Sequence, residues 1–168
     1  MFQKILVALD SAKASDYVFQ KALSLAKLDQ ATLMLLHVLS GEEKGSPNMP
    51  LSPILDYYPQ ASSKAADNYQ KQWRIFEEKC LGQLKGYQEE ALALSVASEV
   101  NQQFGSPGLK VCEVAQTWQA DLIVMGSRGH SLLHQLVLGS VSNYVLHHAP
   151  CSVLIVYPQQ EAGSKKAE

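Results

Sequence analysis

Short apolar runs alternate with longer amphipathic stretches along this chain. Four runs, residues 4–9, 32–39, 122–125 and 151–156, are nearly continuous in Val, Ile and Leu. Such runs are typical of strands that are covered on both faces of a parallel sheet. A fifth run, residues 91–97, alternates Leu92, Leu94 and Val96 with small residues. We interpret this run as one more strand.

The stretches between these runs carry apolar residues at helical spacing. This spacing predicts a helix over residues 14–28 and a long amphipathic helix over residues 66–87. Ser106 and Pro107 are a typical N-cap and first helical position for a third helix. A fourth helix over residues 141–148 is stopped by Pro150.

The resulting β-α-β-α-β-α-β-α-β order predicts the α/β class, as a single-domain open parallel five-stranded sheet with helices on both faces. If the crossovers wind one way for three strands and then return to the other side of the first, a switch point lies between strands one and four. Ligands of open α/β sheets bind at such a point, at the carboxyl ends of the strands. The residues to inspect are therefore Asp10 and the loop after Met125.

Two segments fall outside this pattern. Residues 40–62 hold four of the seven prolines and an apolar patch, which consists of Leu51, Ile54, Leu55, Tyr57 and Tyr58. The segment is longer than a usual connection, so it is a lid, an interface or a disordered excursion, and its apolar patch favours packing on this or another subunit. Residues 158–168 are polar and read as a flexible tail, which leaves residues 1–157 as the domain.

Composition and charge disfavour several kinds of partner. The 168 residues carry a net charge of −2, which does not suit binding to nucleic acid or an anionic membrane. No apolar run approaches the roughly 20 residues of a membrane span, and the apolar run at the N-terminus is too short for a secretory signal, so we expect a cytoplasmic protein. Cys80, Cys112 and Cys151 form no C-x-x-C pair and are expected to be buried, reduced thiols.

A glycine motif follows the fourth apolar run. Gly126-Ser127-Arg128-Gly129 is separated by nine residues from Gly139-Ser140-Val141-Ser142, which opens the last helix. Glycines let main-chain N–H groups approach an anion closely, and a helix N-terminus presents unpaired N–H groups. The serine hydroxyls and Arg128 can add hydrogen bonds and charge, so the motif predicts a nucleotide polyphosphate site. The alternative is that these glycines only form turns.

Several segments together resemble the universal stress protein family. They are residues 4–10, 35–38, 120–129, 138–142 and 148–156. The resemblance covers residues 3–157 and implies a Rossmann-like fold of the adenine nucleotide alpha hydrolase type, with sheet order 3-2-1-4-5. It also implies homodimerisation through the last strand and membership of the ATP-binding subgroup that the glycine motif defines.

The resemblance also implies a role for single residues. It places Ala8 and Leu9 beside the base, Asp10 near the ribose, and the main chain of Val38 against adenine. Gly126, Arg128 and Gly129 would line the path of the ribose and phosphates, and Gly139, Ser140, Val141 and Ser142 would hold the phosphates. For Asp10, an ordinary helix cap is an equally good interpretation from the sequence.

The sequence gives little support for a metal site formed by the protein itself. ATP would bring Mg²⁺ or Mn²⁺ held mainly by phosphate oxygens and water, so we expect no dedicated metal site in the protein. His130 and His134 have the spacing of a metal pair, but Ser131 stands where an H-E-x-x-H motif has glutamate. His37, within a strand, is expected to be a satisfied core histidine.

These observations favour an ATP-binding stress or signalling module. No Walker loop, nucleophile elbow or water-positioning carboxylate is evident, so hydrolysis would be slow and no catalytic residue is assigned. One alternative is a nucleotide-independent dimeric scaffold that works through residues 40–62. The other is an ATPase or phosphotransferase that a partner activates.

Overall fold

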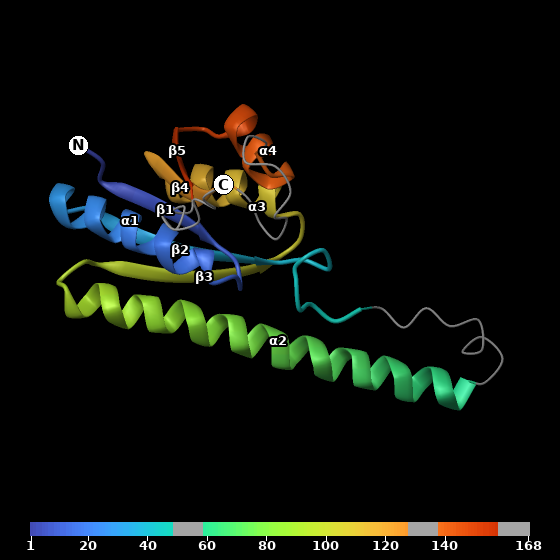
Figure 1. Ribbon diagram of the computed structural model, residues 1–168. Helices are drawn as coiled ribbons and strands as arrows, with labels where there is room; N and C mark the ends of the chain where they lie inside the picture. Colours follow the sequence, from blue (N-terminus) through green and yellow to red (C-terminus); the bar gives the residue numbers. More distant parts are fainter. Residues whose placement is uncertain (49–58, 128–137, 158–168) are drawn as a thin grey trace, which may run out of the picture.

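The computed structural model describes residues 1–48, 59–127 and 138–157. Five parallel strands form one sheet in the order β3-β2-β1-β4-β5 (Figure 1). The strands are β1 (Lys4–Leu9), β2 (Thr32–Leu39), β3 (Ser98–Phe104), β4 (Leu122–Gly126) and β5 (Ser152–Val156). The expected fold class and sheet order are confirmed, and the switch point lies between β1 and β4.

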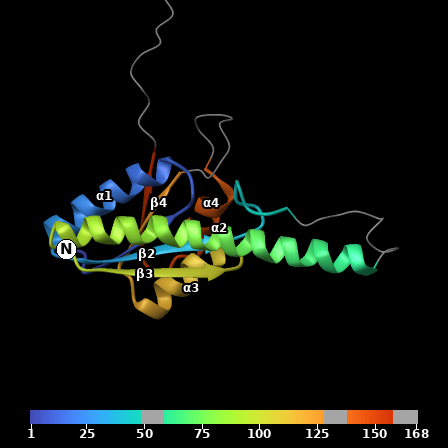
Figure 2. The same cartoon turned by 90° about the horizontal axis from the view of Figure 1, so that it is seen from below.

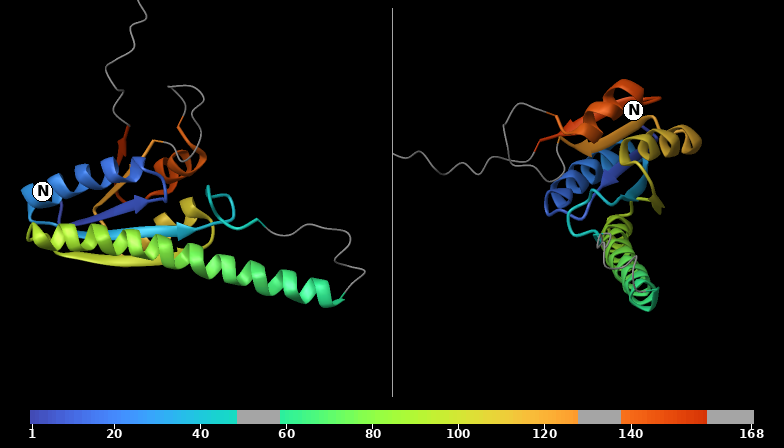
Figure 3. Two further views of the ribbon diagram at one scale, coloured as in Figure 1. Left: turned by 60° about the horizontal axis from the view of Figure 1, so that its bottom comes forward. Right: turned by 90° about the vertical axis from the view of Figure 1, so that its right-hand side faces the viewer.

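Four helices cover the two faces of the sheet. They are α1 (Ala14–Asp29), α2 (Pro59–Ala93), α3 (Pro107–Trp118) and α4 (Ser140–His148). One core combines residues of α1 and α2 with one set of strand positions, and a second core combines α3 and α4 with the alternate set. Figure 3 shows this arrangement from two further sides. The continuous apolar runs of β1, β2 and β4 thus reflect strands buried on both faces, whereas β5 is an edge strand in which only Val156 is buried.

The third strand differs from the prediction. Residues 91–97 are not a strand, because Ala91 to Ala93 end α2 and Ser95 adopts a left-handed φ of 60° in the turn that follows. The strand is Ser98–Phe104, which lies at the edge of the sheet and is mostly half-buried. An edge strand with partly exposed faces can be built from polar residues, so it leaves no apolar run in the sequence.

Helix α2 is longer than predicted at both ends. Its 35 residues span about 52 Å, whereas the seven residues of β3 span only about 23 Å. The helix therefore runs past the sheet at its N-terminal end (Figures 1 and 2). Residues 59–62, assigned from sequence to the proline-rich segment, form the first turn of this helix. The apolar patch within residues 51–58 and the tail 158–168 lie outside the described residues.

The remaining chain-wide expectations concern membranes and cysteines. None of the helices in the described part of the chain is long and apolar enough to cross a membrane. All three cysteines are free thiols, as expected, but only Cys80 is buried, and Cys112 and Cys151 are half-buried. Burial raises the pKa of each thiol above its ordinary value, and Cys80 reaches about 11.

Candidate nucleotide site at the switch point

The ends of β1 and β4 lie side by side at the carboxyl edge of the sheet. Ala8 of β1 is in register with Met125 of β4, so Gly126 directly follows this last pair and Asp10 comes one residue further along, after Leu9. Chains that leave β1 and β4 turn to opposite faces, since β1 continues to α1 and β4 to α4. Residues far apart in the sequence are thereby brought to one place, as the predicted switch point requires.

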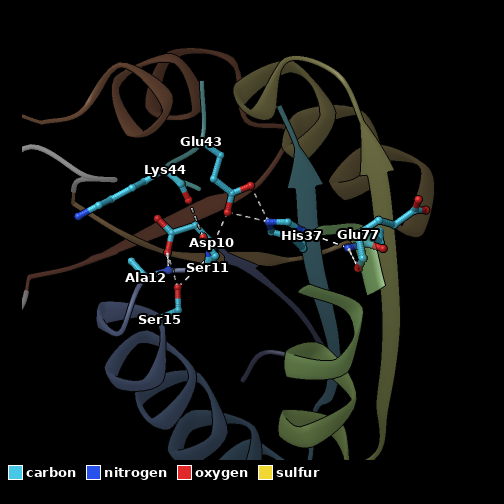
Figure 4. Close-up of polar contacts among 9 residues, drawn as sticks. Asp10, Ser11, Ala12, Ser15, His37, Glu43, Lys44 and Glu77 are labelled. Carbon is cyan, nitrogen blue, oxygen red and sulfur yellow. Dashed lines mark hydrogen bonds and ion pairs between the residues drawn. The ribbon is translucent and has the colours of Figure 1, made fainter. Parts of the chain in front are cut away.

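Asp10 closes the turn that precedes α1. Its Oδ1 accepts hydrogen bonds from the Ala12 amide (3.0 Å) and the Ser15 hydroxyl (2.7 Å), and its own amide donates to Ser15 Oγ (3.0 Å). The N-cap of α1 is Lys13, so Asp10 is not the helix cap. These bonds orient the carboxylate at the end of β1 (Figure 4).

The turn after β1 is held from the other side by Glu43. The Ser11 amide donates to Glu43 Oε1 at 2.9 Å, and His37 Nε2 lies 3.0 Å from each carboxylate oxygen of Glu43 (Figure 4). Gln102 Nε2 lies 3.3 Å from His37 Nδ1 and donates to the Glu77 carbonyl oxygen at 3.2 Å. The expectation that His37 is a satisfied core histidine is confirmed.

The sequence did not predict two residues of this network, Glu43 and Gln102. The side chain of Glu43 is buried although it stands in a proline-rich, polar segment. Burial raises the pKa of its carboxyl, but the hydrogen bond and charge of His37 and the bonds from Ser11 outweigh burial and hold the pKa below its ordinary value. The available signal was a second polar group six residues after a strand histidine, which alone is too weak to assign.

The start of α4 is attached to the end of β4. The Gly139 amide donates to the Ser127 carbonyl oxygen at 2.8 Å, and the Ser142 hydroxyl is 2.9 Å from the same oxygen and 3.0 Å from the Gly139 carbonyl oxygen. Ser127 and Ser142 are both buried. The two ends of the loop between β4 and α4 therefore meet at Ser127 and Gly139.

Helix α4 begins at Ser140 with Gly139 as its N-cap. Helix geometry gives the amides of Ser140, Val141 and Ser142 no acceptor within the helix, and the helix dipole makes this end positive. Gly139 has φ −64°, so its conformation alone does not require glycine. Ser140 is exposed, unlike Ser142. Its hydroxyl and these amides suit an anion.

The other sequence-predicted residues lie around this edge. Leu9 is buried toward α1 and α2, Ala8 is half-buried, and Val38 is buried near the end of β2 toward α3 and α4. Leu9 is in register with His37, the neighbour of Val38, so the ends of β1 and β2 are adjacent. Arg128, Gly129, His130 and His134 lie outside the described residues.

The fold and the geometry of its switch point define a doubly wound α/β domain. The model of the universal stress protein family matches residues 1–157, and the chain belongs to this family. A curated relative, universal stress protein Sll1388 of Synechocystis sp., is 32% identical over 155 residues, which cover 92% of this chain and 97% of the relative.

Solved structures support the same assignment. The universal stress protein UspA from Lactobacillus plantarum has a TM-score of 0.66 at 25% identity, with 92% of this chain and 97% of that chain covered. A universal stress protein family protein from Arabidopsis thaliana, solved with AMP bound, has a TM-score of 0.60 at 18% identity, with 98% and 97% covered. A universal stress protein solved in complex with cAMP has a TM-score of 0.55 at 21% identity, with 93% of this chain and 97% of that chain covered. At these last two identities the likeness shows the shared fold.

Proposed function

We propose that the chain binds ATP at the carboxyl edge of its sheet and acts as a nucleotide-dependent stress-response or signalling module. The observation that carries the proposal is the attachment of α4 to the end of β4, which brings a helix N-terminus to the same edge of the sheet as Asp10. Amides at such an end bind phosphate, and the glycine motif supplies the rest of the loop. AMP and cAMP in structural relatives support an adenine nucleotide.

The residues at this edge suit the parts of the nucleotide. The phosphates would be held by the N-terminal amides of α4, by Ser140 and by the motif residues Arg128 and Gly129. The carboxylate of Asp10 would accept hydrogen bonds from the ribose hydroxyls. The main chains of Ala8 and Val38 would border the base. Mg²⁺ or Mn²⁺ would be held mainly by phosphate oxygens and water, which these ions accept readily. Any hydrolysis would be slow, because no carboxylate is assigned to position the attacking water.

We also propose that the chain forms a homodimer through β5. This strand lies at the edge of the sheet and pairs only with β4 among the described strands. Leu154, in its middle, is 38% exposed. An unpaired edge with an exposed apolar side chain is a surface that a second strand can cover.

Calorimetric titration with ATP and Mg²⁺ tests the proposed site. Wild type should bind one nucleotide per chain, and Gly129→Val should bind at least about tenfold more weakly, because a branched side chain blocks close approach of the main chain to phosphate. Gly82→Ala is the control, since Gly82 is exposed on α2 with no atom within 4 Å of an added Cβ. Equal binding by wild type and Gly129→Val would show that the site is assigned wrongly.

Native mass spectrometry of the purified protein tests the competing roles. Co-purified adenine nucleotide is the expected result, whereas a dimer that neither carries nor binds nucleotide would favour the scaffold role. A phosphate-release assay with saturating ATP tests the third role, that of an ATPase or phosphotransferase. Rapid turnover would contradict the expectation of slow hydrolysis and favour an ATPase.

A further inference from the structure

Three side chains with metal-binding atoms converge beneath the turn that Glu43 stabilises. His37 comes from β2, Glu43 from the turn that follows β2, and Cys80 from the middle of α2. One imidazole nitrogen, one carboxylate oxygen and the thiol sulfur all lie within 4.8 Å of one another. His37 and Cys80 are 3% and 2% exposed, and Glu43 is 9% exposed, so the cluster is largely buried and reaches solvent only at Glu43.

This set of donors matches the chemistry of one class of ion. Zn²⁺ takes thiolate, imidazole and carboxylate ligands in tetrahedral geometry, and ions that demand oxygen ligands, such as Mg²⁺ and Ca²⁺, do not select this set. In a tetrahedral zinc site the ligand atoms lie about 3.3 to 3.6 Å from one another. His37 Nε2 and the Glu43 oxygens, at 3.0 Å, need to separate only slightly, and the sulfur needs to approach by about 1 Å.

We propose that His37, Glu43 and Cys80 form a zinc site whose fourth position is taken by water or an external ligand. Three protein ligands with one open position are typical of zinc sites that are not purely structural. The sequence predicted no metal site in the protein. The three ligands belong to no motif of fixed spacing. Cys80 comes close to His37 and Glu43 only because α2 packs against β2.

Binding requires two changes of protonation. The Cys80 thiol releases its proton to solvent. The His37 ring changes tautomer: Nε2 gives up the proton that faces Glu43 to solvent and binds the metal, and Nδ1 takes up a proton from solvent, so the imidazole stays neutral. Gln102 Nε2 now lies 3.3 Å from Nδ1, so its amide must turn to present its oxygen to that N–H, and it gives up the bond that Nε2 donates to the Glu77 carbonyl oxygen. Glu43 Oε1 can keep the Ser11 amide while Oε2 turns to the metal. Metal binding would therefore act directly on the turn beside Asp10.

The competing explanation is a hydrogen-bonded His–Glu pair beside an inert buried cysteine. Titration of the full-length, tag-free protein with Co²⁺ under reducing conditions separates the two, because a thiolate bound to Co²⁺ gives a charge-transfer absorption band. Wild type should bind one Co²⁺ per chain with this band, and Zn²⁺ should displace it. Absence of stoichiometric binding, or binding without the band, would overturn the proposal.

Matched variants locate the ligand. Cys112→Ser and Cys151→Ser change the other two thiols and should retain the band and the affinity. Cys80→Ser should lose the band and bind at least about tenfold more weakly, since loss of a supporting residue alone often costs that much. An unchanged band in Cys80→Ser would refute the assignment.

A second measurement, of thermal stability with and without Zn²⁺, is needed because a Cys80 variant that is merely unstable could also lose the absorption band. Zn²⁺ should raise the thermal midpoint of wild type, Cys112→Ser and Cys151→Ser but not that of Cys80→Ala, because a ligand stabilises only the state that binds it. Equal stabilisation of Cys80→Ala would contradict the site. Neither readout involves ATP, so the proposed nucleotide function and the zinc site can fail independently.

Discussion

The hydroxyl of Ser142 lies 2.9 Å from the carbonyl oxygen of Ser127, and both residues are buried. The same hydroxyl also reaches the Gly139 carbonyl oxygen. Its single proton is therefore shared between two main-chain acceptors that close the loop between β4 and α4. Ser140, two residues earlier, is exposed at the helix N-terminus. The structure thus separates two serines that look equivalent in the motif.

The first prediction follows from this difference. Ser142→Ala should lower the free energy of unfolding by about 1 kcal/mol, because it removes a buried hydrogen bond while both carbonyl oxygens keep an amide donor. Ser140→Ala should change stability by less than about 0.5 kcal/mol and weaken ATP binding instead. Urea denaturation and calorimetric titration of both variants measure the two effects. The reverse pattern would show that Ser142 is the phosphate ligand.

The second prediction concerns the pH dependence of stability. The pKa of Glu43 is lowered in the folded protein below the ordinary value of 4.5, so its contribution is fully present above about pH 4.5 and is lost as pH falls through the folded pKa. At pH 7, Glu43→Gln should lower the free energy of unfolding by about 1.5 to 3 kcal/mol, as expected for a buried hydrogen bond to a charged group. This deficit should shrink toward acid pH.

Urea denaturation between pH 7 and pH 3.5, with a chelator present, measures this dependence. Glu42→Gln is the control, because Glu42 is the exposed neighbour and should leave stability unchanged. A deficit of the same size at every pH would mean that the carboxylate charge does not contribute.

The third prediction tests the packing of α3 on α4. A Cβ added at Gly108 would lie 2.8 Å from Cδ1 and 3.1 Å from Cβ of Tyr144, so the two helices must shift to admit it. Gly108→Ala should therefore lower the free energy of unfolding by about 1 to 3 kcal/mol. Gly82→Ala on α2, where nothing lies within 4 Å, should raise it by up to about 1 kcal/mol through helix propensity. Thermal and urea denaturation compare them, and equal effects would argue against close packing.

The fourth prediction tests the proposed dimer. Leu154→Lys places a charge on the exposed middle of β5 and should convert the dimer to monomer in sedimentation experiments, because burying an unpaired charge is costly. Leu146→Lys, at a position of similar exposure on α4, should leave the dimer intact. A dimer that survives the β5 change and dissociates with the α4 change would place the interface elsewhere.

Much of the fold could be predicted because continuous apolar runs and helix caps are local features of the sequence. The strands that became β1, β2, β4 and β5 are continuous apolar runs, and the helix that became α3 begins at its Ser-Pro signal. The third strand was missed for the opposite reason. Ser98–Phe104 is a half-buried edge strand, whereas the apolar residues at 91–97 end α2 and form the turn after it.

The candidate site divides in the same way. Asp10, Gly126 and the start of α4 could be placed from the sequence, because strand ends and helix starts are local features that a parallel sheet brings together at one edge. Glu43, Gln102 and Cys80 could not be placed around His37, because their proximity depends on how the turn after β2 and the long helix α2 pack across the sheet.

The sequence by itself determined the order of elements, the buried strands and the glycine motif at the end of β4, since each depends on spacing within a few residues. Only the tertiary structure decided that the hydroxyl of Ser142 supports the main chain and that His37, Glu43 and Cys80 meet in one buried cluster. Hydrophobic burial specifies which face of an element turns inward, but which distant polar groups then come within bonding distance depends on the packing of whole elements.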